Sequence, residues 1–198
     1  MQVYLTSLEN QSSKITMFKP LPCLALCLLL ATGFVSAQDA ASARQAAREL
    51  AGAAKTGDMM WLVEKMYPQL RANLAHNLPG GMKQLNDQYR AMGQALKQQG
   101  VRISEFEVQE PYSECVVKAG REKLVVLPTR CVFEGKDPSS GRNFKLEKIS
   151  FLYALTEVGS KNWTFIDGST LTLNDLRSLI TDVPLTIALP PVSQRVLP

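Results

Sequence analysis

Asp167 is the residue whose type and setting could most directly support catalysis. It follows the aromatic segment 163–166 and precedes Gly168. A carboxylate beside apolar walls acquires a raised pKa and can then accept a proton from a bound molecule. We therefore consider Asp167 a candidate catalytic base. The alternative is that Asp167 and Gly168 only form a turn between two elements.

The other ionisable residues predict neither a metal site nor a standard catalytic motif. His76 is the single histidine, and it precedes a helix break at residues 79–81, where a surface or capping role is expected. An acidic stretch carries four glutamates, Glu105, Glu107, Glu110 and Glu114. Strand alternation places Glu105 and Glu107 on one face, which we expect to be solvated rather than metal-binding. The sequence thus predicts no metal and no cofactor.

The N-terminal residues have the features of a cleavable secretory signal peptide. Lys19 supplies a positive charge, an apolar run spans residues 21–35, and residues 35–37 match the small-x-small cleavage pattern. The run is shorter than the roughly 20 residues of a membrane-spanning helix, so cleavage after Ala37 is favoured over a membrane anchor. Translation starting at Met17 would account for residues 1–16, which resemble no signal element. We predict a periplasmic or secreted protein that does not span the membrane after cleavage.

Cleavage would leave two cysteines, Cys115 and Cys131. An even number of cysteines in an oxidising compartment predicts a disulfide between them. The expected hairpin register argues against this bond, because Cys115 would face Val125 and Cys131 would face Gln109. Bends in the strands would have to bring the two thiols together.

Composition indicates one folded domain without nucleic-acid affinity. The 198-residue chain has a formal net charge of +4, and its basic residues are scattered rather than clustered. We divide it into a signal peptide (1–37), an α+β domain (38–170) and a short helix with a Pro-rich tail (171–198). The apolar tail is expected to lie along the body of the protein or along a partner.

The domain reads as helices followed by antiparallel strands. Helices are predicted at 40–55, from Asp58 as cap to about 78 with a kink or stop at Pro68, and at 82–99 with an apolar stripe. Strands are predicted at 101–108, 113–118, 122–127, 130–134, 143–155 and 162–167, followed by a helix at 173–180. A phase slip predicts a β-bulge near residues 104–105, and Pro128 predicts an edge or a bulge. The helical stripe should pack on the odd-numbered residues of the last two strands.

This element order resembles the nuclear transport factor 2-like superfamily, which includes SnoaL-like proteins. The segment 162–168 (NWTFIDG) is similar to the last strand of exported bacterial members, and the resemblance covers residues 40–170. It implies three N-terminal helices packed on a strongly bent antiparallel sheet, forming a cone with an open mouth. The family contains both enzymes and binding modules, so the resemblance does not decide the function.

Six large aromatic residues could line a cavity of that kind or could belong to the core. They are Trp61, Tyr67, Tyr89, Phe151, Tyr153 and Trp163. The favoured interpretation is an exported, non-enzymatic domain that binds a small apolar ligand or a protein partner. The sequence leaves open whether it forms a homodimer. The alternatives are a cofactor-free enzyme that uses Asp167, and a periplasmic assembly component of an envelope or secretion machine.

Overall fold

The computed structural model describes residues 23–137 and 141–198, with side chains from residue 39 onward. The chain divides into two units, Met1–Val35 and Ser36–Pro198, and the sheet belongs to the second. The predicted signal peptide, residues 1–37, lies outside the residues whose side chains are described, so its export and cleavage stay predictions. In the described part of the chain, no helix is both long enough and apolar enough to cross a membrane.

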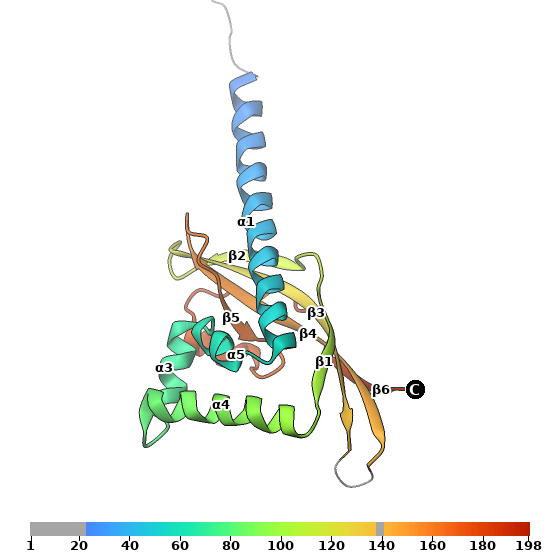
Figure 1. The fold of residues 1–198 in the computed structure, drawn as a ribbon. Coiled ribbons are helices and arrows are strands. Elements are labelled where there is room, and N and C mark those ends of the chain that lie inside the picture. The colour runs from blue at the N-terminus through green and yellow to red at the C-terminus, as the bar shows by residue number, and fades with distance from the viewer. Residues whose placement is uncertain (1–22, 138–140) are drawn as a thin grey trace, which may run out of the picture. The chain divides into compact units, whose positions relative to one another are not determined.

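Between residue 23 and the first strand, the structure consists of helices and short connections (Figure 1). The helices are α1 (Cys23–Thr56), α2 (Met59–Glu64), α3 (Pro68–His76) and α4 (Gly81–Gln98). Gly57 follows α1 with a φ of +73°, a conformation that glycine adopts without strain. The Asp58 carboxylate accepts a hydrogen bond from the Trp61 N–H at 3.0 Å and caps α2, as predicted. Pro68 begins α3, where its missing N–H leaves no hydrogen bond unmade.

The rest of the second unit contains a six-stranded antiparallel sheet in its described residues. The strands are β1 (Arg102–Val108), β2 (Ser113–Val117), β3 (Glu122–Lys136), β4 (Asn143–Glu157), β5 (Thr164–Asp167) and β6 (Ser193–Leu197). β3 and β4 are central and pair along their whole lengths. β2 and β1 pair with successive parts of β3, while β5 and β6 pair with successive parts of β4. The α+β class is therefore as predicted.

The two predicted irregularities have different outcomes. The register between β1 and β3 shifts between Ile103 and Glu105, which confirms the bulge. Pro128 instead lies inside the central strand β3, which continues through it. At this point the neighbouring strand changes from β2 to β1, and the carbonyl of Pro128 accepts a hydrogen bond from the Gln109 N–H at 2.9 Å. Proline is tolerated here because its missing N–H falls at the junction between two partner strands.

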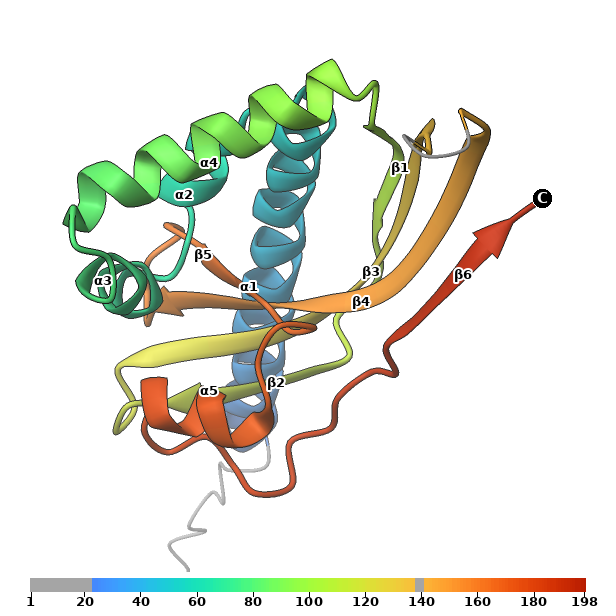
Figure 2. The same ribbon diagram turned by 90° about the horizontal axis from the view of Figure 1, so that it is seen from below.

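The sheet is covered on both faces, and alternation along the strands separates two apolar clusters. We call them the α1 face and the α5 face. On the α1 face, Ala43, Ala47, Leu50 and Ala51 of α1 pack with strand residues that include Val125, Leu127, Leu152 and Phe165. On the α5 face, Leu176 and Ile180 pack with Leu124, Val126, Phe151 and Tyr153. Figure 2 shows α5 on the opposite side of the sheet from α4, and shows β4 curving along its length.

The predicted packing of the amphipathic helix is wrong. α4 packs against α2 and α3, and the buried helical residues of the cluster on the α1 face come from α1 instead. The odd-numbered strand residues also do not share a side. β4 and β5 pair Ala154 with Phe165, so Phe165 lies on the α1 face while Phe151 and Tyr153 lie on the α5 face. In this register an even-numbered residue of β4 lies opposite an odd-numbered residue of β5. The sequence of either strand alone cannot show this.

The C-terminal segment returns across the sheet. Helix α5 (Leu173–Leu179) begins at Thr172, whose side chain and that of Asp175 form a capping box. The tail then runs along the body of the protein, one of the two predicted alternatives, and ends in β6 beside β4 (Figure 2). Ser113 Oγ donates a hydrogen bond to the Ala188 carbonyl at 2.8 Å, and Arg195 pairs with Glu147.

Candidate functional site

A cavity of about 560 Å³ lies between the helices and the α1 face of the sheet. The helices contribute mostly aliphatic side chains to its lining: Leu50, Ala54, Leu62, Met66, Leu70 and Leu74. The strands add Ile103, Phe106, Phe133, Leu152, Phe165 and Ile166. A mostly apolar cavity of this size is typical of sites for small molecules.

Polar side chains interrupt this lining on neighbouring strands. Lys148 and Ser150 of β4 alternate with core residues and face the same side as Leu152, while Thr129 lies opposite Ser150 on β3. Asp167 lies opposite Leu152 at the end of β5. The Lys148 Nζ is 3.5 Å from Asp167 Oδ2, and the Ser150 hydroxyl is 3.5 Å from Asp167 Oδ1. The register of three strands thus gathers a small polar group in an apolar cavity.

Asp167 forms the turn that was one of the two alternatives considered for it, and it also lines the cavity, while its role as a catalytic base stays a prediction. Its Oδ1 accepts hydrogen bonds from the Ser169 N–H at 2.9 Å and the Ser169 hydroxyl at 2.7 Å. Its carbonyl accepts one from the Thr170 hydroxyl at 2.8 Å. The turn fixes the carboxylate, while Lys148 donates to the Ser169 hydroxyl at 2.7 Å. Asp167 is therefore held by charge-assisted contacts rather than by apolar walls alone.

Cys131 also lines the cavity, and its thiol is free. The predicted disulfide to Cys115 is wrong. Cys115 pairs with Leu124 of β3 on the α5 face, whereas Cys131 lies seven residues further along β3 on the α1 face. At about 3.3 Å per residue the α-carbons are roughly 20 Å apart, far beyond the 7 Å that a disulfide can bridge. Burial raises the pKa of the Cys131 thiol to about 11, although Lys148 and Lys55 oppose the shift.

Tyr89 is the predicted aromatic residue that the structure brings to the cavity. Burial raises the pKa of its phenol. The remaining five residues do not line this cavity. Tyr67, Phe151 and Tyr153 belong to the α5-face cluster, and Trp163 belongs to the α1-face cluster, where its Nε1 donates to Ser42 Oγ at 3.0 Å. Trp61 packs beside that cluster under the ammonium of Lys65.

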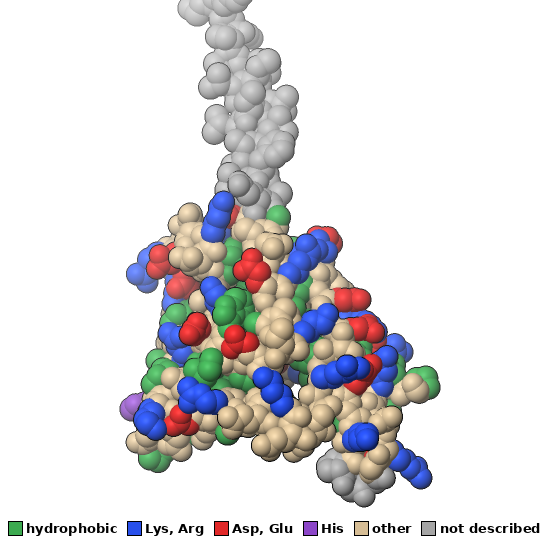
Figure 3. Space-filling view, in the orientation of Figure 1, with side chains coloured by type: hydrophobic (Ala, Val, Ile, Leu, Met, Phe, Trp, Pro, Cys, Tyr) green, Lys and Arg blue, Asp and Glu red, His purple; other side chains and the backbone are tan. Residues whose placement is uncertain are grey.

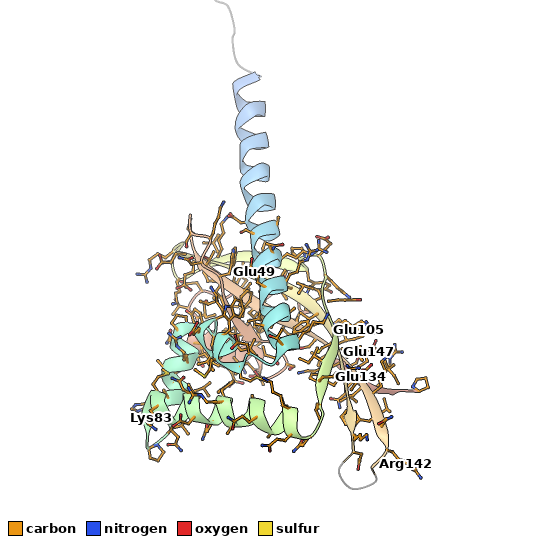
Figure 4. The ribbon with its side chains drawn as sticks, viewed as in Figure 1. Glu49, Lys83, Glu105, Glu134, Arg142 and Glu147 are labelled. Atoms are coloured by element: carbon orange, nitrogen blue, oxygen red, sulfur yellow. The ribbon has the colours of Figure 1, made fainter. Side chains whose placement is uncertain are left out.

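The other ionisable candidates lie away from the cavity. His76 is exposed at the last residue of α3. Glu105 and Glu107 share a face, where both contact Arg130, and Glu110 pairs with Arg44. Figure 4 labels Glu105 and Glu147 close together beside the central strands; Arg130 joins them through ion pairs. Within the described residues, no group of histidine, cysteine or acidic side chains could hold a metal ion.

Charged side chains of both signs are interspersed over the face of the protein drawn in Figure 3. The ion pairs agree with this view. Glu134 contacts Arg102 and Lys145, and Asp87 contacts Lys83 and Arg90. Each of these four basic side chains therefore has an acidic partner beside it.

Sequence reasoning missed most of the polar group. Ser150 is the one polar residue in the otherwise apolar segment 149–155 of β4, which is a usable signal of a polar site inside a core. The phase slip of that strand hid the signal, because it left open which residues share a side with Asp167. Thr129 follows Pro128 and falls in the gap between the predicted strands 122–127 and 130–134.

No protein-family model, no curated protein and no solved structure matches this chain.

Proposed function

We propose that this protein binds a small, mostly apolar molecule in the cavity on the α1 face. The cavity itself carries the proposal, because it combines about 560 Å³ of space with an aliphatic lining and a few polar groups. Filling such a space with apolar atoms removes both partners from water, which is the main source of affinity for apolar ligands. In this proposal the protein acts as a carrier or receptor module rather than as an enzyme.

Asp167 offers less support for the enzymatic alternative. Its Oδ1 already accepts two hydrogen bonds from Ser169, and Lys148 lies beside Oδ2. The carboxylate oxygens are therefore already engaged by neighbouring groups of the protein, whereas a catalytic base must be within hydrogen-bond reach of the proton that it abstracts. Binding without chemistry is therefore the better proposal.

The supporting experiment fills the cavity with a side chain of its own. Ala54 is buried in the lining on α1, whereas Ala41 is exposed on the same helix. We expect the purified protein to bind the uncharged fluorescent probe N-phenyl-1-naphthylamine. Ala54→Phe should lose this binding by at least about tenfold, and Ala41→Phe should retain it. Circular dichroism melts establish that both variants fold. Equal binding by Ala54→Phe and the parent would contradict the proposal.

We further propose that the protein acts outside the cytoplasm after cleavage behind Ala37. The support is the order of a positive residue, an apolar run and a cleavage pattern in residues 19–37. N-terminal sequencing of the protein from its native envelope or medium should begin at Gln38. Recovery of the intact apolar segment would contradict this proposal.

The cone-like form of the nuclear transport factor 2-like superfamily is part of the same proposal. Its support is the order of the elements, with helices before an antiparallel sheet, and a cavity between the two. An experimental structure with a bound ligand would test both the resemblance and the site.

A further inference from the structure

The polar group of the cavity has a charge balance that restricts the ligand. Among the lining residues that the structure describes, Lys148 is the only cation and Asp167 the only anion. Their charged atoms lie 3.5 Å apart, with the Ser150 and Ser169 hydroxyls beside them. The two side chains are 30% and 45% exposed, so neither is sealed away from the cavity. The site therefore presents a dipole, with no excess charge in its lining.

A charged ligand group would gain little from such a site. A carboxylate near Lys148 would also lie near Asp167, and an ammonium near Asp167 would lie near Lys148. Either group would lose its hydration while meeting one attractive and one repulsive charge. Lys55 adds a further positive charge near Cys131, but it is exposed and outside the lining, so water and salt screen it.

An uncharged group that both donates and accepts hydrogen bonds fits the pair without this conflict. A hydroxyl or a primary amide can donate to Asp167 and accept from Lys148 at once. Ser150 and Thr129 offer further hydroxyls on the adjacent strands. We infer that the ligand is an apolar molecule with an uncharged hydroxyl or amide head, and that the head lies between Lys148 and Asp167. This inference rests on the proposed function.

The aliphatic part of the lining accounts for the rest of the ligand. Leu50 of α1, Leu62 of α2, Leu70 of α3 and Phe106 of β1 surround the cavity from four different elements. These four side chains offer no hydrogen-bonding group, so a polar group of the ligand placed beside them would be left unpaired. The part of the ligand that lies against them is hydrocarbon.

Three probes with the same ten-carbon chain separate the head groups. Decan-1-ol below its solubility limit, and decanoate and decylammonium below their micelle concentrations, are used to displace N-phenyl-1-naphthylamine from the protein at pH 7. Decan-1-ol should displace the probe at concentrations at least about tenfold lower than either ion. Tighter binding of decanoate or of decylammonium would overturn the inference while leaving the proposed function intact. If the fluorescent probe itself does not bind, the proposed function fails first.

Two charge-removing variants test the assignment of the head group to this pair. Asp167→Asn keeps the turn but leaves the charge of Lys148 without its partner. The affinity for decanoate should therefore rise at least about tenfold relative to the affinity for decan-1-ol. Lys148→Met leaves the charge of Asp167 without its partner, so the affinity for decylammonium should rise instead. Lys145→Met, on the same strand but outside the cavity lining, should leave the order of the three probes unchanged. An unchanged order in both cavity variants would show that the head lies elsewhere and would overturn the inference.

Discussion

The backbone of Gly168 lies directly against the ring of Phe151. A β-carbon at residue 168 would stand 2.0 Å from Phe151 Cε2, and the Gly168 N–H donates to the Phe151 carbonyl at 2.9 Å. This contact joins the turn that carries Asp167 to the central strand β4. Position 168 therefore requires glycine for space, and the turn beside the cavity depends on it.

Gly168→Ala should destabilise the protein by about 1–3 kcal/mol, because the added methyl group must displace a buried ring or the turn. Gly52 is the matched control: it is exposed within α1 and has nothing within 4 Å of an added β-carbon. Gly52→Ala should be neutral or stabilise by up to about 1 kcal/mol, because alanine favours the helix. Urea denaturation measures both. A Gly168→Ala protein as stable as the parent would contradict the packing described here.

Leu85 is the buried anchor of α4 against its neighbouring helices. It is 3% exposed, whereas Met92 on the same helix is 44% exposed. Leu85→Ala should lower the free energy of unfolding by about 2–5 kcal/mol, the usual cost of a cavity in a core. Met92→Ala should change it by less than about 0.5 kcal/mol. Similar losses for both variants, measured by urea denaturation, would show that the assumed burial of α4 is wrong.

The two thiols should be free and should differ in reactivity. Burial raises the pKa of both, with Cys131 reaching about 11 and Cys115 half-buried beside Glu114. At pH 8 little of either thiol is ionised, so alkylation of the folded protein by iodoacetamide should be slow, and slower at Cys131. Both should react fully in urea without reductant. Peptide mass spectrometry locates the adducts, and a protein that needs reductant for alkylation would contradict the free thiols.

Acid should loosen the C-terminal strand β6 through Glu147. This carboxylate is 3% exposed and lies between Arg195 and Arg130, and hydrogen bonds from these two guanidinium groups lower its pKa. The stabilising effect is therefore present above the unfolded pKa of about 4.3 and is lost as the pH falls through the lower folded value. The protection factors of the β6 amides, which correct for the slower intrinsic exchange in acid, should fall in that range.

Glu147→Gln should remove most of this acid dependence and should raise β6 exchange already at pH 7. Glu157→Gln, an exposed change on the same strand, provides the control. If β6 exchange in Glu147→Gln matches that of the parent at pH 7 and in acid, the ion pair with Arg195 does not hold the tail.

The sequence by itself determined the local elements of this protein. The cap at Asp58 and the bulge after Ile103 both follow from neighbouring residues, so their signals survive without tertiary information. Asp167 could be chosen as a candidate for the same reason, because an acidic residue after an aromatic strand is visible in the sequence.

The tertiary structure decided which of these residues meet. The register between β4 and β5 pairs Ala154 with Phe165, and this single relation places Asp167 on the side of Lys148 and Ser150 while sending Tyr153 to the other face. The register between β2 and β3 separates Cys115 from Cys131, because it places Cys115 opposite Leu124. Side chains alternate between the two faces of a strand, so a shift of one residue in the pairing exchanges the faces. The sequence of one strand does not show which residues of its partner lie on the same face.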